Sequence, residues 1–175
     1  MDIVVYESLY GNTAAVAREI AAGLGEDARA MPTSEATPDV VAAARLVVAG
    51  APVHALSLPT AKSRESARAK PQGHERMAAD LGHVAMREWL ASLPRGARLG
   101  AAFDTRVKGP LGHGAATAIA TTLAADGYTL LDEPHGFTVH MHTSASTPGA
   151  LLAAGEREAA RAWGERLRAA AAALA

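Results

Sequence analysis

The sequence contains no cysteine, aromatic residues make up only 4% of it, and neither sign of charge predominates. The absence of cysteine excludes disulfides, thiolate metal sites, iron–sulfur clusters and cysteine nucleophiles. With 17 basic and 18 acidic residues, the chain gives no electrostatic reason to expect a nucleic acid or a membrane surface as a partner. No apolar run is long enough to cross a bilayer and no basic leader precedes the first apolar run, so we expect a cytoplasmic protein.

The 175 residues, 49% of them hydrophobic, are enough to bury one core, so we expect a single domain over residues 1–175. Short apolar or β-branched runs alternate along the chain with longer segments of helical periodicity. The predicted strands are residues 2–6, 28–31, 46–50, 98–103 and 136–142. The predicted helices are residues 13–24, 39–44, 82–93, 115–125 and 151–174.

This alternation indicates a parallel sheet. Parallel strands that are buried on both faces read as continuous apolar runs, and right-handed crossovers place helices over both faces. We therefore predict a doubly wound α/β fold of five parallel strands with helices on both faces. Trp89 and Trp163 lie in predicted helices, and we interpret both as side chains that pack against the sheet rather than as ligand contacts.

Residues 54–81 are too many for a simple connection between a strand and a helix, and connections of that length tend to be functional or disordered. Within residues 61–77, five basic residues against two acidic ones give a local net charge of +3. The five basic residues are Lys62, Arg64, Arg68, Lys70 and Arg76. We leave open whether this long basic loop is simply solvated or contacts a partner or a nucleotide phosphate.

The most specific pattern lies in the turn after the first predicted strand, where residues 8–13 read Ser-Leu-Tyr-Gly-Asn-Thr. In a doubly wound sheet, such a turn lies at the carboxyl ends of the strands, where ligands bind. Ser8 and Thr13 offer hydroxyl groups, Gly11 allows close backbone approach, and the following helix offers unpaired N–H groups. Without lysine or arginine, these groups favour a single terminal phosphate over a magnesium-bound triphosphate. The alternative is an ordinary Gly-Asn turn with a capping threonine.

This turn resembles the flavodoxin phosphate loop, whose pattern is Ser/Thr-x-Thr/Tyr-Gly-x-Thr and which also follows the first strand. The resemblance implies a flavodoxin-like sheet with strand order 2-1-3-4-5. It also implies flavin mononucleotide (FMN) as the cofactor. The phosphate contacts that it implies, through side chains or backbone, are Ser8, Leu9, Tyr10, Gly11, Asn12 and Thr13.

Two further segments extend the resemblance over nearly the whole chain. Residues 46–54 are similar to the third strand of the family and the loop after it, which lies along one side of the flavin ring. Residues 101–106 are similar to the fourth strand and its loop, which covers the other edge. The ring contacts that this implies are Ala51, Pro52, Val53 and His54, and then Asp104, Thr105 and Arg106. The fifth strand has no long interruption, as in the short-chain members of the family.

The chain departs from the family in the side chains expected beside the ring. Flavodoxins usually clamp the ring between aromatic side chains, but residues 104–113 contain none. His54 could stack on one face of the ring, and Leu56 or Leu58 could fold over the other. Flavodoxins are also commonly acidic, whereas this chain is near neutral, so we expect its partner to differ.

Other candidate residues have two interpretations each. His135, His140 and His142 could form a metal triad, or could lie at the flavin rim or the surface. Asp104 could accept a hydrogen bond from the flavin N3–H, or could cap the following loop through Thr105 and Arg106. We predict no metal site, and no side chain that must act as an acid, a base or a nucleophile.

The resemblance implies an FMN-binding protein that carries electrons between redox partner proteins, with the redox chemistry supplied by the cofactor. One alternative is an FMN-dependent NAD(P)H oxidoreductase that reduces a quinone or a similar acceptor. A second alternative is a flavin-free interaction or regulatory module, which the missing aromatic clamp suggests.

Overall fold

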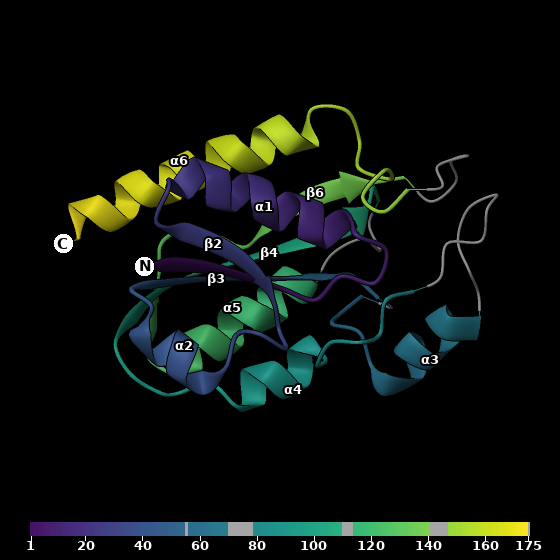
Figure 1. Cartoon of the computed structure of the whole chain (residues 1–175), viewed down its shortest axis with the longest axis horizontal. Helices are drawn as coiled ribbons and strands as arrows, with labels where there is room; N and C mark the ends of the chain where they lie inside the picture. Colours follow the sequence, from purple (N-terminus) through teal and green to yellow (C-terminus); the bar gives the residue numbers. More distant parts are fainter. Residues whose placement is uncertain (55, 70–78, 110–113, 141–146, 175) are drawn as a thin grey trace.

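The computed structural model describes residues 1–54, 56–69, 79–109, 114–140 and 147–174. Within these residues, strands and helices alternate along the chain (Figure 1). The strands are β1 (Asp2–Tyr6), β2 (Ala28–Pro32), β3 (Leu46–Pro52), β4 (Arg98–Val107), β5 (Tyr128–Leu130) and β6 (His135–Val139). The helices are α1 (Asn12–Leu24), α2 (Pro38–Ala43), α3 (Ala61–Ala69), α4 (Met86–Ala91), α5 (Ala115–Ala125) and α6 (Glu156–Ala173).

The strands form one sheet, parallel throughout, in the order β2-β1-β3-β4-β5, with β6 also paired to β4. β5 pairs with residues 98–100 of β4, and β6 pairs with residues 103–107. The two short strands therefore lie end to end along one edge and together take the place of a fifth strand. The predicted doubly wound fold and strand order are confirmed.

The predicted bounds of the fifth strand, residues 136–142, were wrong. This edge begins at Tyr128, breaks at residues 131–134, and ends as a strand at Val139. The break contains Asp132, whose carboxylate accepts a hydrogen bond from the Trp163 side chain at 2.8 Å. It also contains Pro134, which has no N–H group to donate to a ladder. Residues 141 and 142 lie outside the described residues.

The segment between β3 and β4 also differs from the prediction. The predicted long loop contains a helix, α3, and the helix predicted at residues 82–93 is the shorter α4. Ala67 is the buried residue of α3, so the sequence of this helix carries no apolar stripe that would have revealed it. Residues 70–78 lie outside the described residues. Elsewhere α6 begins at Glu156 rather than at residue 151.

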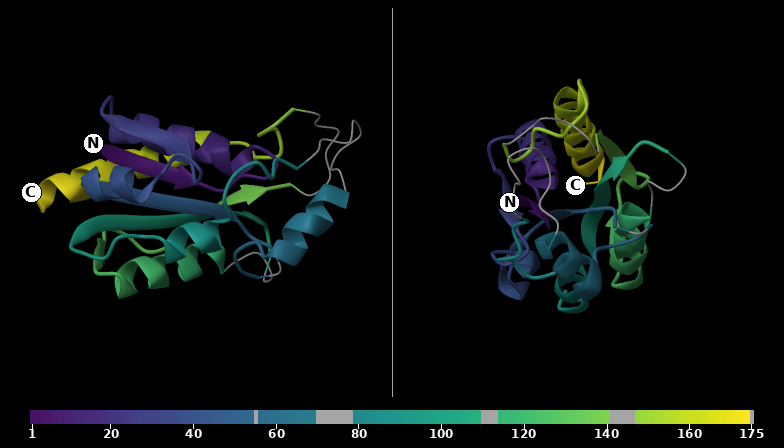
Figure 2. Two further views of the ribbon diagram at one scale, coloured as in Figure 1. Left: turned by 60° about the horizontal axis from the view of Figure 1, so that its bottom comes forward. Right: turned by 90° about the vertical axis from the view of Figure 1, so that its right-hand side faces the viewer.

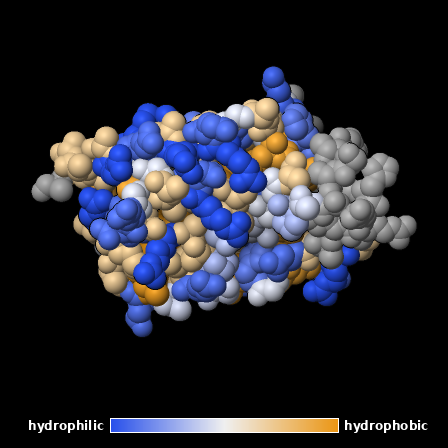
Figure 3. All heavy atoms as spheres, turned by 45° about the horizontal axis from the view of Figure 1, so that its top comes forward, coloured by the Kyte–Doolittle hydropathy of each residue, from blue (hydrophilic) through white to orange (hydrophobic). Residues whose placement is uncertain are grey.

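Helices cover both faces of the sheet (Figure 2). α1 and α6 pack on one face, and α2, α4 and α5 pack on the other. Trp163 and Trp89 are buried in these two cores, one on each face, as predicted. Hydrophilic side chains are spread over the outer surface on the α1 and α6 side (Figure 3). Among the described helices, none combines the length and apolar character needed to cross a membrane.

α1 and α6 cross at glycines, which brings their backbones close together. A Cβ on Gly164 would lie 2.3 Å from the carbonyl oxygen of Ile20. Gly164→Ala should therefore lower the free energy of unfolding by about 1–3 kcal/mol, the usual cost of overpacking, although alanine is otherwise the better helix former. Urea denaturation measures this change, with the exposed Ala162→Ser as control. Unchanged stability of Gly164→Ala would contradict the close crossing.

His135 packs in the same core, with its ring stacked on Trp163 at 5.1 Å between centroids. Burial is the main cause that lowers the pKa of His135, and Arg166 lowers it further. In the unfolded chain, His135 binds a proton near the ordinary pKa of about 6.5, whereas in the folded chain it does so only at lower pH. The free energy of unfolding should therefore fall as the pH drops below about 6.5. Urea denaturation at about pH 7.5 and 5.5 should show a smaller loss for His135→Phe than for the wild type. Equal losses would contradict this assignment.

Candidate functional site

Residues 8–13, here called the β1–α1 turn, lead from β1 into α1, which begins within the turn at Asn12. Gly11 has a φ of 80°, a left-handed conformation that glycine adopts without strain. The Ser8 Oγ accepts a hydrogen bond from the Ala14 N–H (3.2 Å), which ties the turn to the first turn of the helix. The Thr13 Oγ1 lies 2.8 Å from the Thr105 Oγ1 on β4, so the turn is also tied to the sheet.

The β1–α1 turn carries backbone donors that the described part of the chain does not use. The N–H groups of residues 9–13 donate to no acceptor among the described residues. The N-terminus of α1 adds the partial positive charge of the helix dipole. Successive free N–H groups at a helix N-terminus are the donor set that binds a phosphate or a carboxylate. The side chains of Ser8 and Thr13 are buried beside these groups.

A segment from far along the chain closes one side of the turn. The Gly149 N–H donates to the Tyr10 carbonyl oxygen (3.0 Å), and the Leu151 N–H donates to the Asn12 Oδ1 (3.1 Å). A Cβ on Gly11 would lie 2.6 Å from the Pro148 Cβ, so this segment packs directly against the glycine. The Asn12 side chain therefore anchors the segment before α6, a role that the sequence did not reveal.

A cavity of about 180 Å³, here called the β3–β4 cavity, opens beside the turn at the carboxyl ends of β3 and β4. It gathers predicted site residues from three separate segments of the chain, namely Ser8, Leu9, Tyr10, Asn12, Thr13, Pro52, Val53, His54 and Thr105. Val107, Val139, His140 and Leu151 complete its lining. Most of the residues that the sequence suggested for one ligand thus lie around one cavity.

Four predicted contacts, Gly11, Ala51, Asp104 and Arg106, do not line the β3–β4 cavity. Ala51 is buried in the core on the side of α2, α4 and α5. The Asp104 carboxylate is fully buried and accepts hydrogen bonds from Arg106 and from the Ala116 N–H (2.9 Å). Successive residues of a strand point to opposite faces, so Thr105 reaches the cavity while Asp104 caps the start of α5.

The loop after β3 forms a tight turn at the cavity. The His54 N–H donates to the Ser57 carbonyl oxygen (2.9 Å) and the Ser57 N–H donates back to His54 (3.1 Å). Leu56 in this turn has a φ of 68° and is 48% exposed, an unusual conformation for a leucine. Burial is the main cause that lowers the pKa of His54, so its ring is neutral at pH 7. Leu58 is buried in the core.

Of the three histidines considered as a metal triad, the structure describes His135 and His140, and these two lie in different surroundings. His135 stacks on Trp163 in the core, whereas His140 lines the β3–β4 cavity. His142 lies outside the described residues. Within the described part of the chain, no three histidine or acidic side chains are grouped as metal ligands would be.

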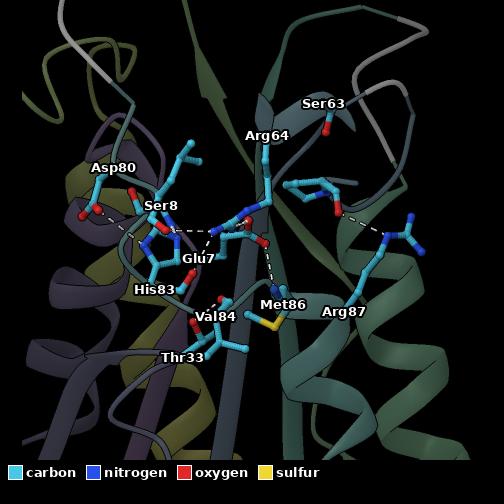
Figure 4. Close-up of polar contacts among 12 residues, drawn as sticks. Glu7, Ser8, Thr33, Ser63, Arg64, Asp80, His83, Val84, Met86 and Arg87 are labelled. Carbon is cyan, nitrogen blue, oxygen red and sulfur yellow. Dashed lines mark hydrogen bonds and ion pairs between the residues drawn. The ribbon is translucent and has the colours of Figure 1, made fainter. Parts of the chain in front are cut away.

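A buried polar cluster that the sequence did not reveal lies directly before the β1–α1 turn (Figure 4). The carboxylate of Glu7, which is fully buried, accepts hydrogen bonds from Arg64 on α3 and from the Met86 N–H at the start of α4 (2.9 Å). Arg64 also donates to the His83 carbonyl oxygen (2.7 Å). The His83 Nε2 in turn accepts from the Ser8 N–H (3.3 Å). This cluster therefore joins α3, His83 and the start of α4 to the turn.

Two of the three basic residues of the long basic loop that the structure describes form ion pairs, and the third is Lys62. Arg64 forms a buried ion pair with Glu7, and Arg68 forms an exposed ion pair with Glu65 (3.7 Å). Lys70 and Arg76 lie outside the described residues. The structure thus gives this segment a structural attachment through Arg64 in addition to its surface charges.

A second cavity, of about 430 Å³, lies on the other side of the β1–α1 turn, toward β2. Ser8, Leu9 and Tyr10 line both cavities, while Arg18 and His83 line the second alone. Four predicted ring contacts line only the β3–β4 cavity, namely Pro52, Val53, His54 and Thr105, whereas Gly11 lines only the second cavity. We therefore take the β3–β4 cavity, together with the turn, as the candidate site.

No protein-family model and no curated protein sequence matches the chain. A flavodoxin from the domain Archaea is 19% identical, with a TM-score of 0.63 over 98% of each chain. The oxidised flavodoxin 1 of Bacillus cereus is 12% identical, with a TM-score of 0.60 over 94% of this chain and 95% of that one.

The two-electron reduced flavodoxin of Megasphaera elsdenii is 18% identical, with a TM-score of 0.56 over 98% of this chain and 99% of that one. At identities this low, the TM-scores show a shared fold and nothing further. The strand order and the place of the β1–α1 turn agree with that likeness. The chain therefore has a flavodoxin-like fold.

Proposed function

We propose that the chain binds one FMN at the β1–α1 turn and the β3–β4 cavity, and carries electrons between redox partner proteins. The observation that carries this proposal is the run of N–H groups at residues 9–13 that find no acceptor among the described residues, beside a cavity at the carboxyl ends of β3 and β4. The flavodoxin-like fold supports FMN as the cofactor, because the solved structures that it resembles are flavodoxins. A cytoplasmic location stays a prediction.

The residues fit the phosphate end of FMN. Neutral donors surround the expected phosphate, namely the N–H groups of the turn and the hydroxyl groups of Ser8 and Thr13. The cavity, at about 180 Å³, is smaller than the roughly 300–1,000 Å³ of sites that enclose a small molecule. We therefore place the phosphate and ribityl chain inside it and the flavin ring at its mouth.

The lining of the cavity offers His54 as a flat, neutral ring for stacking and the exposed side chain of Val107 as an apolar contact. When bound, FMN supplies one- and two-electron transfer. The chain holds the phosphate, orients the ring at the surface and shields part of it from water. Each aromatic contact that is missing lowers the affinity by about 0.5–1.5 kcal/mol, so we expect weaker binding than with a full aromatic clamp.

The reductase alternative needs a site for a second nucleotide phosphate, which the long basic loop was a candidate to provide. Arg64 and Arg68 are already paired with carboxylates in the described part of that segment. We therefore favour the electron carrier. FMN-loaded protein should not sustain multiple turnovers of NADPH with a quinone, and steady turnover without a partner protein would instead establish a reductase.

The cofactor site is tested by removing its hydroxyl groups. The Ser8→Ala, Thr13→Ala double variant should bind FMN at least about tenfold more weakly than the wild type, because a hydrogen bond to a charged group contributes about 1.5–3 kcal/mol. Quenching of flavin fluorescence during titration of flavin-free protein measures the affinity. Thr121→Ala, which alters an exposed hydroxyl on α5, is the control. Equal affinities of the double variant and the wild type would contradict the assigned site.

A further inference from the structure

Glu7 poses an electrostatic problem for the proposed phosphate site. Its carboxylate is fully buried, and Glu7 directly precedes Ser8, the first residue of the β1–α1 turn. A buried negative charge so close to the turn repels a bound phosphate, because the protein interior screens charges much less than water does. A site of this kind therefore needs a cation that compensates Glu7.

Arg64 supplies that cation from α3. Its guanidinium pairs with the Glu7 carboxylate (Figure 4). Only 12% of the Arg64 side chain is exposed. The Met86 N–H satisfies the second carboxylate oxygen at 2.9 Å. Arg64 is fixed in place by its further hydrogen bond to the His83 carbonyl oxygen (2.7 Å). The Glu7–Arg64 pair is thus held in place by hydrogen bonds directly beside the β1–α1 turn.

The charges of this pair act on both sides of the turn. Burial is the main cause that lowers the pKa of His54 in one cavity wall and of His83 in the other. At each histidine, Glu7 raises the pKa and Arg64 lowers it, so the two charges oppose one another. A phosphate held between these walls is exposed to the same two opposing charges.

We propose that Arg64 is a positioning residue of the phosphate site, which neutralises Glu7 and so permits the β1–α1 turn to bind a dianionic phosphate that Arg64 itself does not touch. This inference rests on the proposed function and names the residue that makes the site selective for a phosphorylated flavin. It also gives the helix of the long basic loop a part in cofactor binding.

The test compares FMN with riboflavin, which carries the same ring and ribityl chain without the phosphate. The readout is the ratio of the riboflavin Kd to the FMN Kd, measured at low salt between pH 7 and 9, where the phosphate is a dianion. Arg64→Met should lower this ratio at least about tenfold at pH 9. Glu7→Gln combined with Arg64→Met should restore it. Arg68→Met, which removes an exposed cation from the same helix, should leave it unchanged.

A pH profile separates the charge effect from a structural one. In Arg64→Met, the described titratable groups that still interact with Glu7 are His54 and His83, and Asp80 lies beside His83. Burial keeps both histidines neutral above pH 7. The ratio in this variant should therefore be lowest at the highest pH, where a carboxylate without its cation carries its full charge, while the wild-type ratio stays flat. A purely structural role of Arg64 would weaken FMN and riboflavin equally at every pH, and that result would overturn the proposal.

Glu7→Gln alone keeps the test decisive if Arg64→Met does not fold. It leaves the Arg64 charge uncompensated, so the ratio should rise above that of the double variant. Equal ratios in Glu7→Gln and the double variant would overturn the inference. If the wild type itself binds FMN no better than riboflavin, the proposed function fails instead, so the two failures are distinguishable.

Discussion

Arg64→Met should lower the free energy of unfolding by about 3–5 kcal/mol at pH 8, because it leaves the Glu7 carboxylate buried without its cation. Glu7 is fully buried, and its hydrogen bond from the Met86 N–H (2.9 Å) cannot replace the solvation that the carboxylate loses. The same change removes the ion pair that ties α3 to the residue after β1, so the attachment of α3 should weaken.

The dependence on pH identifies the buried charge as the cause. Burial without a cation disfavours the charged form of a carboxylate, so protonation should relieve part of the cost of Arg64→Met. The folded state then binds more protons than the unfolded state, so the loss of stability should shrink between pH 8 and 6. Urea denaturation at both pH values measures the change, with Arg68→Met as control.

The Glu7→Gln, Arg64→Met double variant should recover most of the stability, because a neutral amide can still accept the Met86 hydrogen bond. If Arg64→Met lowered the free energy of unfolding by less than about 1 kcal/mol, the Arg64–Glu7 pair would not be what holds α3 in place. An equally large loss in the double variant would contradict the buried charge as the cause.

Gly11→Ala should weaken FMN binding at least about a hundredfold. Gly11 has a φ of 80°, and the added Cβ would lie 2.6 Å from the Pro148 Cβ and 2.8 Å from the Gly149 nitrogen. Relief of these contacts requires the β1–α1 turn to move, which misaligns its N–H groups. The loss of one or two hydrogen bonds to a charged phosphate, at about 1.5–3 kcal/mol each, accounts for that factor.

Gly155 provides a matched control for this prediction. It precedes α6 as Gly11 precedes α1, with φ 84° and ψ −10° against φ 80° and ψ −8° at Gly11. A Cβ on Gly155 would meet nothing within 4 Å. Both alanine variants therefore share the backbone strain, of about 1–2 kcal/mol, but only Gly11→Ala should lose FMN affinity. Similar affinities in the two variants would contradict the assigned phosphate site.

The sequence was sufficient to predict the sheet and the turn because both are local patterns. Residues 3–5 of β1 and 46–49 of β3 are uninterrupted runs of buried apolar side chains. The turn between β1 and α1 carries its hydrogen-bond donors in six consecutive residues. Their positions at one sheet edge follow from the parallel order of the strands. Most of the residues that line the β3–β4 cavity could therefore be predicted.

The missed features depend on contacts between distant residues. α3 has no apolar stripe, and its attachment is the pairing of Arg64 with Glu7, fifty-seven positions earlier in the chain. Glu7 resembles an ordinary turn residue in the sequence, although a charge directly after a buried strand is a signal that a partner is required. The contacts of residues 148–151 with Gly11 and Asn12 are likewise invisible until the chain is folded.

The most direct test of the central claim is a calorimetric titration of flavin-free wild-type protein with FMN and, separately, with riboflavin. We predict one FMN bound per chain with a Kd below about 10 μM, equivalent to about −7 kcal/mol, and riboflavin bound at least about tenfold more weakly. The difference would measure the contribution of the phosphate at the β1–α1 turn. Absence of FMN binding well above 10 μM, or equal affinities for the two flavins, would contradict the account and would favour a flavin-free module.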